Sequence, residues 1–95
     1  MAEIKVRFLS LLTDITRTEE LTLTIDENCT IKHLLEQLTK KFGENFEELI
    51  YKASQNLSKY VLITINGKDI RLLDGLETQI NDRDEINFIP AIAGG

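Results

Sequence analysis

The chain is poor in the residues from which catalytic and metal sites are most often built. It contains one cysteine, Cys29, and one histidine, His33. A single cysteine excludes an internal disulfide and a cluster of thiolate metal ligands. The lone histidine has no identifiable base or orienting partner, so we expect its ring to lie at the surface, near the third position of a helix. We also expect Cys29 to serve packing rather than thiol chemistry.

Motifs of catalysis and cofactor binding are absent as well. The sequence has no glycine-rich phosphate loop, no nucleophile elbow and no pair of histidines at metal-ligand spacing. Asp82 and Asp84 could suggest a cation site, but a solvated turn is the simpler interpretation. We therefore expect a protein that is not an enzyme and that binds no metal or cofactor of its own.

Long hydrophobic runs are missing too. No apolar stretch is long enough to cross a bilayer, and residues 1–5 lack the arrangement of a signal peptide, which favours a cytoplasmic protein. Acidic residues outnumber basic ones by 16 to 11, giving a formal net charge of -5. This charge argues against nucleic-acid or anionic-membrane partners and favours a basic groove on a partner protein.

What the chain does contain is a clear alternation of hydrophobic and polar residues. Its 42% hydrophobic and 28% charged composition over 95 residues is typical of one globular domain. Ile4, Val6 and Phe8 alternate with charged residues, which is the period-two pattern of a half-buried strand. Similar patterns, with the hairpin signal Asn66-Gly67, predict strands over residues 4–9, 21–25, 60–65, 68–72 and 85–89. A long loop with a polar turn through residues 14–17 is expected to join the first two strands.

One segment changes to helical spacing. Hydrophobic residues recur along one stripe of a predicted helix over residues 30–42, with Thr30 as its N-cap and Gly43 as its left-handed end. The stripe consists of Ile31, Leu34, Leu35, Leu38 and Phe42. Phe46, Leu49 and Ile50 predict a second, short helix, and residues 56–58 are expected to form a loop.

The order of these elements is hairpin, helix, hairpin and final strand. It predicts an α+β fold, a ubiquitin-like β-grasp in which a mixed sheet of about five strands carries one main helix across one face. The final strand is expected beside the first, in the middle of the sheet. Residues 1–90 then form the domain, and residues 91–95 form a flexible C-terminal tail.

Strand alternation also predicts a docking surface. If Phe8, Ile63 and Phe88 point toward the helix, then Leu9, Leu62 and Ile89 point away from it. These three residues come from strands that are neighbours in a β-grasp, so they should cluster on the helix-free face. An exposed apolar cluster beside a chain end usually marks a protein docking surface.

The C-terminus carries the chemical prediction. Gly94 and Gly95 lack side chains, so they can enter a slot too narrow for a Cβ atom. Pro90 stiffens the exit from the sheet and cannot extend its hydrogen-bond ladder. A free carboxylate becomes a good electrophile once it is joined to AMP. Attack by sulfide then gives a thiocarboxylate, as does attack by persulfide once a thiol has cleaved the S–S bond of the acyl disulfide, whereas attack by a lysine amine gives an amide.

The whole chain resembles the MoaD and ThiS family of sulfur carriers and their relatives, the ubiquitin-related and small archaeal modifiers. The resemblance lies in four segments: Ile4-Lys5-Val6-Arg7-Phe8, Ile65-Asn66-Gly67, Asp84-Glu85-Ile86 and Ile89-Pro90-Ala91-Ile92-Ala93-Gly94-Gly95. It implies that an ATP-using, ubiquitin-activating-type enzyme adenylates Gly95 and that sulfur transfer yields a thiocarboxylate. The length and Pro90 are more similar to MoaD, which implies molybdopterin synthesis with a larger synthase subunit.

The resemblance also implies which residues meet the partners. They are Leu9, Leu62, Ile89, Pro90 and Ile92, together with the activated Gly94-Gly95 end. A modifier conjugated to lysines of target proteins shares the same activation chemistry, so the sequence leaves the carrier and the modifier open, as it does the final sulfur acceptor. A passive interaction domain is the third alternative. Arg83 departs from the family, because many relatives carry glycine before Asp84-Glu85, and the segment of residues 44–59 is long.

Overall fold

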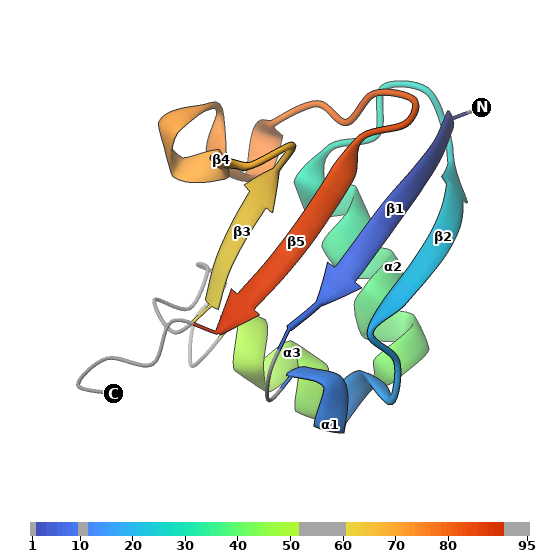
Figure 1. Cartoon of the computed structure of the whole chain (residues 1–95), viewed down its shortest axis with the longest axis vertical. Helices are drawn as coiled ribbons and strands as arrows, with labels where there is room; N and C mark the ends of the chain where they lie inside the picture. Colours follow the sequence, from blue (N-terminus) through green and yellow to red (C-terminus); the bar gives the residue numbers. More distant parts are fainter. Residues whose placement is uncertain (1, 10–11, 52–60, 91–95) are drawn as a thin grey trace.

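The computed structural model of the chain describes residues 2–9, 12–51 and 61–90 (Figure 1). Its strands are β1 (Ala2–Phe8), β2 (Glu20–Ile25), β3 (Val61–Ile65), β4 (Lys68–Asp69) and β5 (Glu85–Pro90). Its helices are α1 (Leu12–Thr16), α2 (Ile31–Phe42) and α3 (Glu44–Tyr51), with two 3-10 turns, η1 (Ile70–Leu72) and η2 (Gly75–Glu77). The loop predicted over residues 56–58 and the tail predicted over residues 91–95 lie outside the described residues.

The five strands form one mixed sheet in the order β2-β1-β5-β3-β4. β1 and β5 run parallel, and the other neighbouring pairs are antiparallel. The last strand therefore lies beside the first, in the middle of the sheet, and α2 crosses one face behind it (Figure 1). This arrangement confirms the predicted α+β fold and the ubiquitin-like β-grasp.

Helix α2 is built as its sequence predicts. The side-chain oxygen of Thr30 accepts a hydrogen bond from the backbone N–H of His33, and the N–H of Thr30 donates to the ring Nδ1 of His33 at 3.3 Å. Ile31, Leu34, Leu35 and Leu38 are buried against the sheet, and Phe42 is partly buried. Gly43 ends the helix with φ 87°, a left-handed conformation that glycine adopts without a Cβ clash.

All four phenylalanines of the chain meet at one end of the core. The ring of Phe8 lies 5.5 Å from that of Phe42, 6.1 Å from that of Phe46 and 5.4 Å from that of Phe88. The first two pairs are edge-to-face, an arrangement that aromatic rings prefer. Phe8 and Phe88 are inward residues near the ends of β1 and β5. The cluster therefore fills the core beneath the end of the sheet at which Leu9 and Ile89 lie.

Two predictions about local structure are wrong. The polar segment after β1 holds a five-residue helix, α1, in which the Thr16 hydroxyl donates to the carbonyl oxygen of Leu12 and Leu12 is fully buried. The predicted strand over residues 68–72 is only two residues long. The Asp69 carboxylate accepts a hydrogen bond from the backbone N–H of Arg71 at 2.8 Å, and this cap turns the chain into η1.

The turn before β5 contains a strained residue. Arg83 has φ 70°, although its side chain is 91% exposed and makes, among the described residues, a long ion pair of 3.9 Å with Asp82. Its backbone N–H donates to the carbonyl oxygen of Glu3 at 2.7 Å, which holds the turn against β1. The left-handed conformation explains why glycine suits this position.

We expect Arg83→Gly to stabilise the fold. Removing the Cβ atom relieves a cost of about 1–2 kcal/mol, and the greater freedom of glycine in the unfolded chain offsets about 0.5–1 kcal/mol of that gain. The free energy of unfolding should therefore rise by about 0.5–1 kcal/mol in urea titrations. Arg83→Ala is the control, because it removes the same charge but keeps the Cβ atom. A gain of equal size in Arg83→Ala would contradict the explanation by backbone strain.

Candidate functional site

The helix-free face of the sheet brings together three residues that the sequence predicts for docking. Leu62 of β3 and Ile89 of β5 lie directly opposite each other in the antiparallel register. Leu9 follows β1 and continues its pairing, because its N–H donates to the carbonyl oxygen of Phe88 at 3.1 Å. Leu9, Leu62 and Ile89, here called the docking patch, therefore come from three adjacent strands, as predicted.

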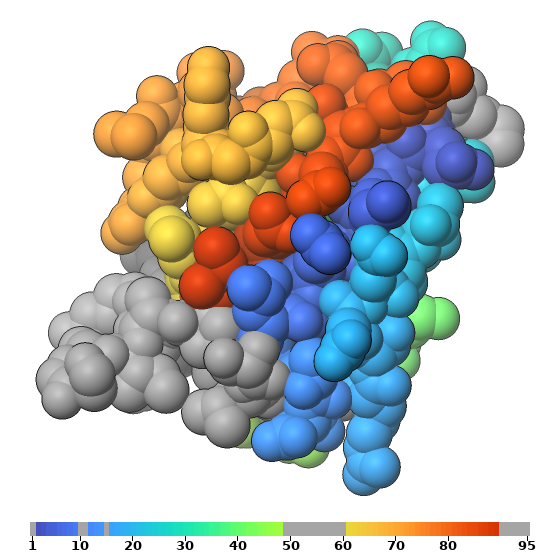
Figure 2. Space-filling view, viewed as in Figure 1, coloured from blue at the N-terminus to red at the C-terminus, as the bar shows by residue number. Residues whose placement is uncertain are grey.

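The docking patch is accessible in the free chain. Leu9 is 39% exposed, and Leu62 and Ile89 are half-buried. Figure 2 shows this face, with β5 running between β3 and β1. The residues next to them in the chain, Phe8, Ile63 and Phe88, are buried on the face that α2 covers. The sheet therefore carries apolar side chains on both faces here.

A charged belt borders the docking patch. Arg7 of β1 lies between two carboxylates, with Nε 3.6 Å from Glu20 and Nη1 3.5 Å from Glu85. Lys5 adds a third contact, 3.8 Å from Glu20. These groups are about half exposed, so their ion pairs contribute little to stability and are available to steer or select a partner.

A pocket of about 550 Å³ opens between the docking patch and the belt. Arg7, Phe8, Leu9, Glu19, Asn87 and Ile89 are among the residues that line it. Arg7, Glu19 and Asn87 were not predicted from the sequence to line this site. Arg7 and Asn87 could have been assigned to the outer face by alternation, but their pairing follows only from the β1–β5 register.

The chain leaves the sheet next to the docking patch. β5 ends at Pro90, which pairs with Val61 at the start of β3. Pro90 therefore lies one residue beyond Ile89 on the central strand. Ile92, Gly94 and Gly95, which the sequence predicts for partner binding and activation, lie outside the described residues. Their roles stay predictions.

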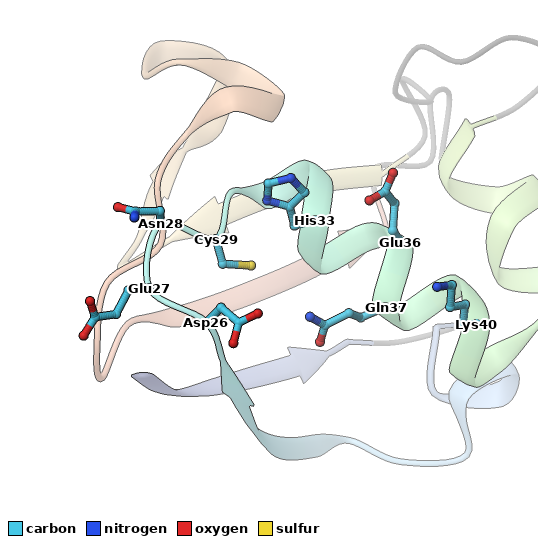
Figure 3. Close-up of a pocket in the computed structure, with 8 residues that line it drawn as sticks. All are labelled: Asp26, Glu27, Asn28, Cys29, His33, Glu36, Gln37 and Lys40. Atoms are coloured by element: carbon cyan, nitrogen blue, oxygen red, sulfur yellow. The ribbon is translucent and has the colours of Figure 1, made fainter. Parts of the chain in front are cut away.

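A second pocket lies where α2 begins (Figure 3). Cys29 and Asp26 face it from the preceding loop, and Gln37 points back toward Asp26 from the helix. Cys29 is 4% exposed, and burial, with Asp26 nearby, raises the pKa of its thiol. Cys29 belongs to the buried hydrophobic core, as expected of a packing residue, and a buried thiol with a raised pKa is a poor nucleophile. His33 is engaged in capping α2, as its position predicts.

The acidic turn before β5 holds structural hydrogen bonds. The Asp82 carboxylate accepts from the N–H of Glu3, and the Asp84 carboxylate accepts from Asn81 and Asn66. This confirms a turn at Asp82 and Asp84. Within the described ranges, no group of three or more His, Cys, Asp or Glu side chains could hold a metal ion. No helix there is long and apolar enough to cross a membrane.

Comparison with known proteins identifies the family. The model of the ThiS family matches residues 6–95, nearly the whole chain. The chain belongs to the ThiS family. A protein of Archaeoglobus fulgidus described as a sulfur carrier is 35% identical over 74 residues, which is 77% of this chain and 83% of that protein. The sulfur carrier protein CysO of Mycobacterium tuberculosis is 33% identical over 67 residues, 70% of this chain and 72% of CysO.

Solved structures agree with this assignment. The small archaeal modifier protein 1 of Methanosarcina acetivorans matches with a TM-score of 0.83 and 34% identity, over 100% of this chain and 98% of that one. A molybdopterin converting factor subunit 1 of Pyrococcus furiosus shares the fold, with a TM-score of 0.77, 18% identity, and 97% and 100% coverage. The relatives of this ThiS-family chain at 33–35% identity are thus described as sulfur carriers and as a small archaeal modifier.

Proposed function

We propose that this ThiS-family chain is a sulfur carrier whose terminal Gly95 is adenylated by a ubiquitin-activating-type enzyme and converted to a thiocarboxylate. The observation that carries the proposal is the Gly94-Gly95 end, which comes four and five residues after the end of a central strand that carries Ile89 of the apolar docking patch. The family match extends to residue 95 and so includes this end. Two relatives, 35% and 33% identical to the chain over the matched residues, are described as sulfur carriers.

The chemistry needs only a carboxylate that fits a narrow slot. An oxygen of the Gly95 carboxylate bonds to the α-phosphorus of ATP, and the bond to pyrophosphate breaks. Sulfide then bonds to the acyl carbon, and AMP leaves with the electron pair of the broken C–O bond. The chain contributes no acid or base in this scheme. It contributes an unhindered end and a rigid surface that holds this end at the active site of the enzyme.

For the destination of the sulfur, we propose molybdopterin synthesis, in which the chain is the non-catalytic small subunit beside a larger synthase subunit. The length of the chain, Pro90 and the helix with its following segment support this assignment, because they are more similar to MoaD than to the shorter ThiS proteins. The shared fold with a molybdopterin converting factor subunit is consistent with it.

A second function is favoured by a separate observation. The 34% identity over the full chain to a small archaeal modifier supports conjugation of Gly95 to lysines of target proteins. Both functions begin with the same acyl adenylate. They differ in the nucleophile that follows, which is sulfide or persulfide for the carrier and a lysine amine for the modifier.

Reconstitution separates the two. The chain is incubated with the ubiquitin-activating-type enzyme of the same genome, ATP and sulfide, and then with the molybdopterin synthase large subunit and its precursor. Conversion of the precursor to molybdopterin supports the carrier. If thiocarboxylate forms but no molybdopterin does, another acceptor takes the sulfur. Lysine-linked adducts in native lysate, lost on removal of Gly95, would instead support the modifier.

The docking patch provides a further prediction. Leu62→Glu should leave the melting temperature nearly unchanged, because Leu62 is only half-buried and faces away from the helix. It should weaken binding to the activating enzyme by about tenfold or more, since a carboxylate would be desolvated without a partner in an apolar contact. Isothermal titration with the enzyme measures the effect.

The control for Leu62→Glu is Leu72→Glu. Leu72 is 82% exposed and lies in η1, toward the end of β3 that is remote from Leu62 (Figure 1). The same change of chemistry there should leave the affinity of the enzyme unaltered. Equal affinities for Leu62→Glu and the wild type would rule out the docking patch as part of the interface.

A further inference from the structure

One residue that lines the pocket beside the docking patch, Asn87, has a buried side-chain oxygen without a hydrogen-bond partner among the described residues. Asn87 of β5 is half-buried as a whole, and the unpaired oxygen is Oδ1. Buried polar atoms are nearly always paired, so an exception at the surface of a binding face points to a donor supplied from outside. Asn87 lies directly across from Arg7 of β1 and Thr64 of β3.

The nearest cation does not satisfy this oxygen. Arg7 is turned to Glu20 and Glu85, which hold its guanidinium at 3.6 Å and 3.5 Å. Lys5 shares Glu20 with Arg7, so Lys5 and Arg7 are balanced by Glu20 and Glu85. The charge that a further cation would meet in the pocket is therefore that of Glu19.

A second acceptor faces the same pocket. Glu19 is exposed, and its carboxylate forms no ion pair with any residue that the structure describes. Its backbone oxygen is used, because it accepts from the N–H of Phe8 at 2.9 Å, so the position of Glu19 is fixed by β1. The pocket thus offers the exposed Glu19 carboxylate directly, whereas the buried Asn87 amide oxygen becomes a second acceptor once the amide turns toward the pocket.

The remaining walls are formed by Thr13 and by apolar side chains. Leu9 and Ile89 line the pocket, and both belong to the docking patch. A side chain that suits such a site has an aliphatic stem to lie on these two residues and a charged head with several donors. Arginine has both, and its planar fork can serve a carboxylate and an amide oxygen at once.

We infer that this pocket receives an arginine side chain of the activating enzyme, with Glu19 and Asn87 as its acceptors. The inference rests on the proposed function and names the chemistry of the partner at this surface. Rotation of the Asn87 amide about χ2, a soft torsion, turns Oδ1 toward the arriving donor. Glu19 and Asn87 then select the partner, while Leu9 and Ile89 supply apolar contact.

Two variants test the inference by ATP-pyrophosphate exchange with the ubiquitin-activating-type enzyme of the same genome. Glu19→Gln removes the charge, and Asn87→Leu removes the unmet acceptor. Each should raise the KM for the chain by about tenfold, as expected for loss of a hydrogen bond to a charged group, and leave kcat unchanged. Asn87→Leu should also raise the melting temperature, because a buried unpaired atom is removed.

Two controls match these variants on the other side of the molecule. Glu36→Gln removes an equal charge from the exposed side of α2, and Thr39→Val removes the other buried oxygen that has no partner among the described residues. Both should keep the wild-type KM. Raising the salt concentration should increase the KM of the wild type more than that of Glu19→Gln, because only the wild type retains the screened charge pair.

The outcomes separate this inference from the proposed function. If removal of Gly95 abolishes exchange but Glu19→Gln and Asn87→Leu keep the wild-type KM, the pocket does not bind the enzyme and the inference fails alone. A lower KM for Asn87→Leu would indicate an apolar occupant, and a lower KM for Glu19→Gln would indicate an anionic one. Either result would also overturn the inference. If removal of Gly95 leaves exchange intact, the proposed function fails, whatever the pocket variants show.

Discussion

Removal of Gly95 is expected to abolish ATP-dependent adenylation of the chain without changing its melting temperature. The new terminal carboxylate would lie one residue short, about 3.3–3.6 Å of extended chain from the phosphorus that it must attack. A misplacement of about 1 Å can already lower a rate by a factor of about a hundred. The buried core among the described residues ends at Phe88, so folding should not depend on the last residue. Pyrophosphate exchange and thermal melting measure the two effects.

Gly94→Leu complements the truncation. It keeps the length of the chain but places a side chain where the enzyme slot is expected to be too narrow for a Cβ atom, so exchange should again be lost. The two variants fail for different reasons, one for reach and the other for bulk. The control is Ala2→Gly, at the first residue of β1 and therefore at the other end of that strand from Leu9 of the docking patch. It should exchange at the wild-type rate. Normal exchange by the truncated chain would favour a passive interaction domain.

Leu35→Ala is expected to give the largest loss of stability among the variants considered. Leu35 is fully buried on the face of α2 that packs against the sheet. Truncation leaves a cavity, and the free energy of unfolding should fall by about 2–5 kcal/mol. For a domain of this size, a small core makes such a loss a large part of the total. Urea titration followed by circular dichroism measures it.

The matched control for Leu35→Ala is Leu72→Ala. Leu72 is 82% exposed, so the same truncation should change the free energy of unfolding by less than about 0.5 kcal/mol. Similar losses in the two variants would mean that the buried face of α2 is assigned incorrectly.

The long-range architecture was predictable because hydrophobic periodicity reports burial directly. The hydrophobic residues from Ile31 to Leu38 recur with the period of a helix, and those from Ile4 to Phe8 recur with the two-residue period of a strand. Each period shows which side of its element is buried. Once the faces are known, Leu9, Leu62 and Ile89 must share the outer side of the sheet. The docking patch is therefore a consequence of the same pattern that builds the core.

Short elements could not be predicted in this way. Helix α1 spans five residues, barely more than one turn, so no periodicity can develop in it. The end of β4 depends on a local cap that competes with strand pairing, in which the backbone N–H and the guanidinium of Arg71 donate to the carboxylate of Asp69. In both places a side chain bonded to nearby backbone outweighs the propensity of the segment.

The pocket beside the docking patch was also out of reach of sequence reasoning. Glu19 precedes β2, whereas Asn87 lies on β5. They line one pocket because β1 is the single strand between β2 and β5 in the sheet. The unmet oxygen of Asn87 is a property of packing rather than of pattern. Such a property depends on the three-dimensional arrangement of side chains and leaves no pattern in the sequence.

The most direct test of the sulfur-carrier account is mass spectrometry of the chain recovered from its native cells. Trypsin cleaves after Arg83 and releases residues 84–95, a peptide without Met or Cys, so that oxidation of Met1 or Cys29 cannot alter its mass. We expect a fraction of this peptide to carry sulfur in place of one terminal oxygen, with fragmentation placing the change at Gly95. A peptide found only as the free carboxylate, even from cells in which the activating enzyme is abundant and sulfide is supplied, would contradict the account.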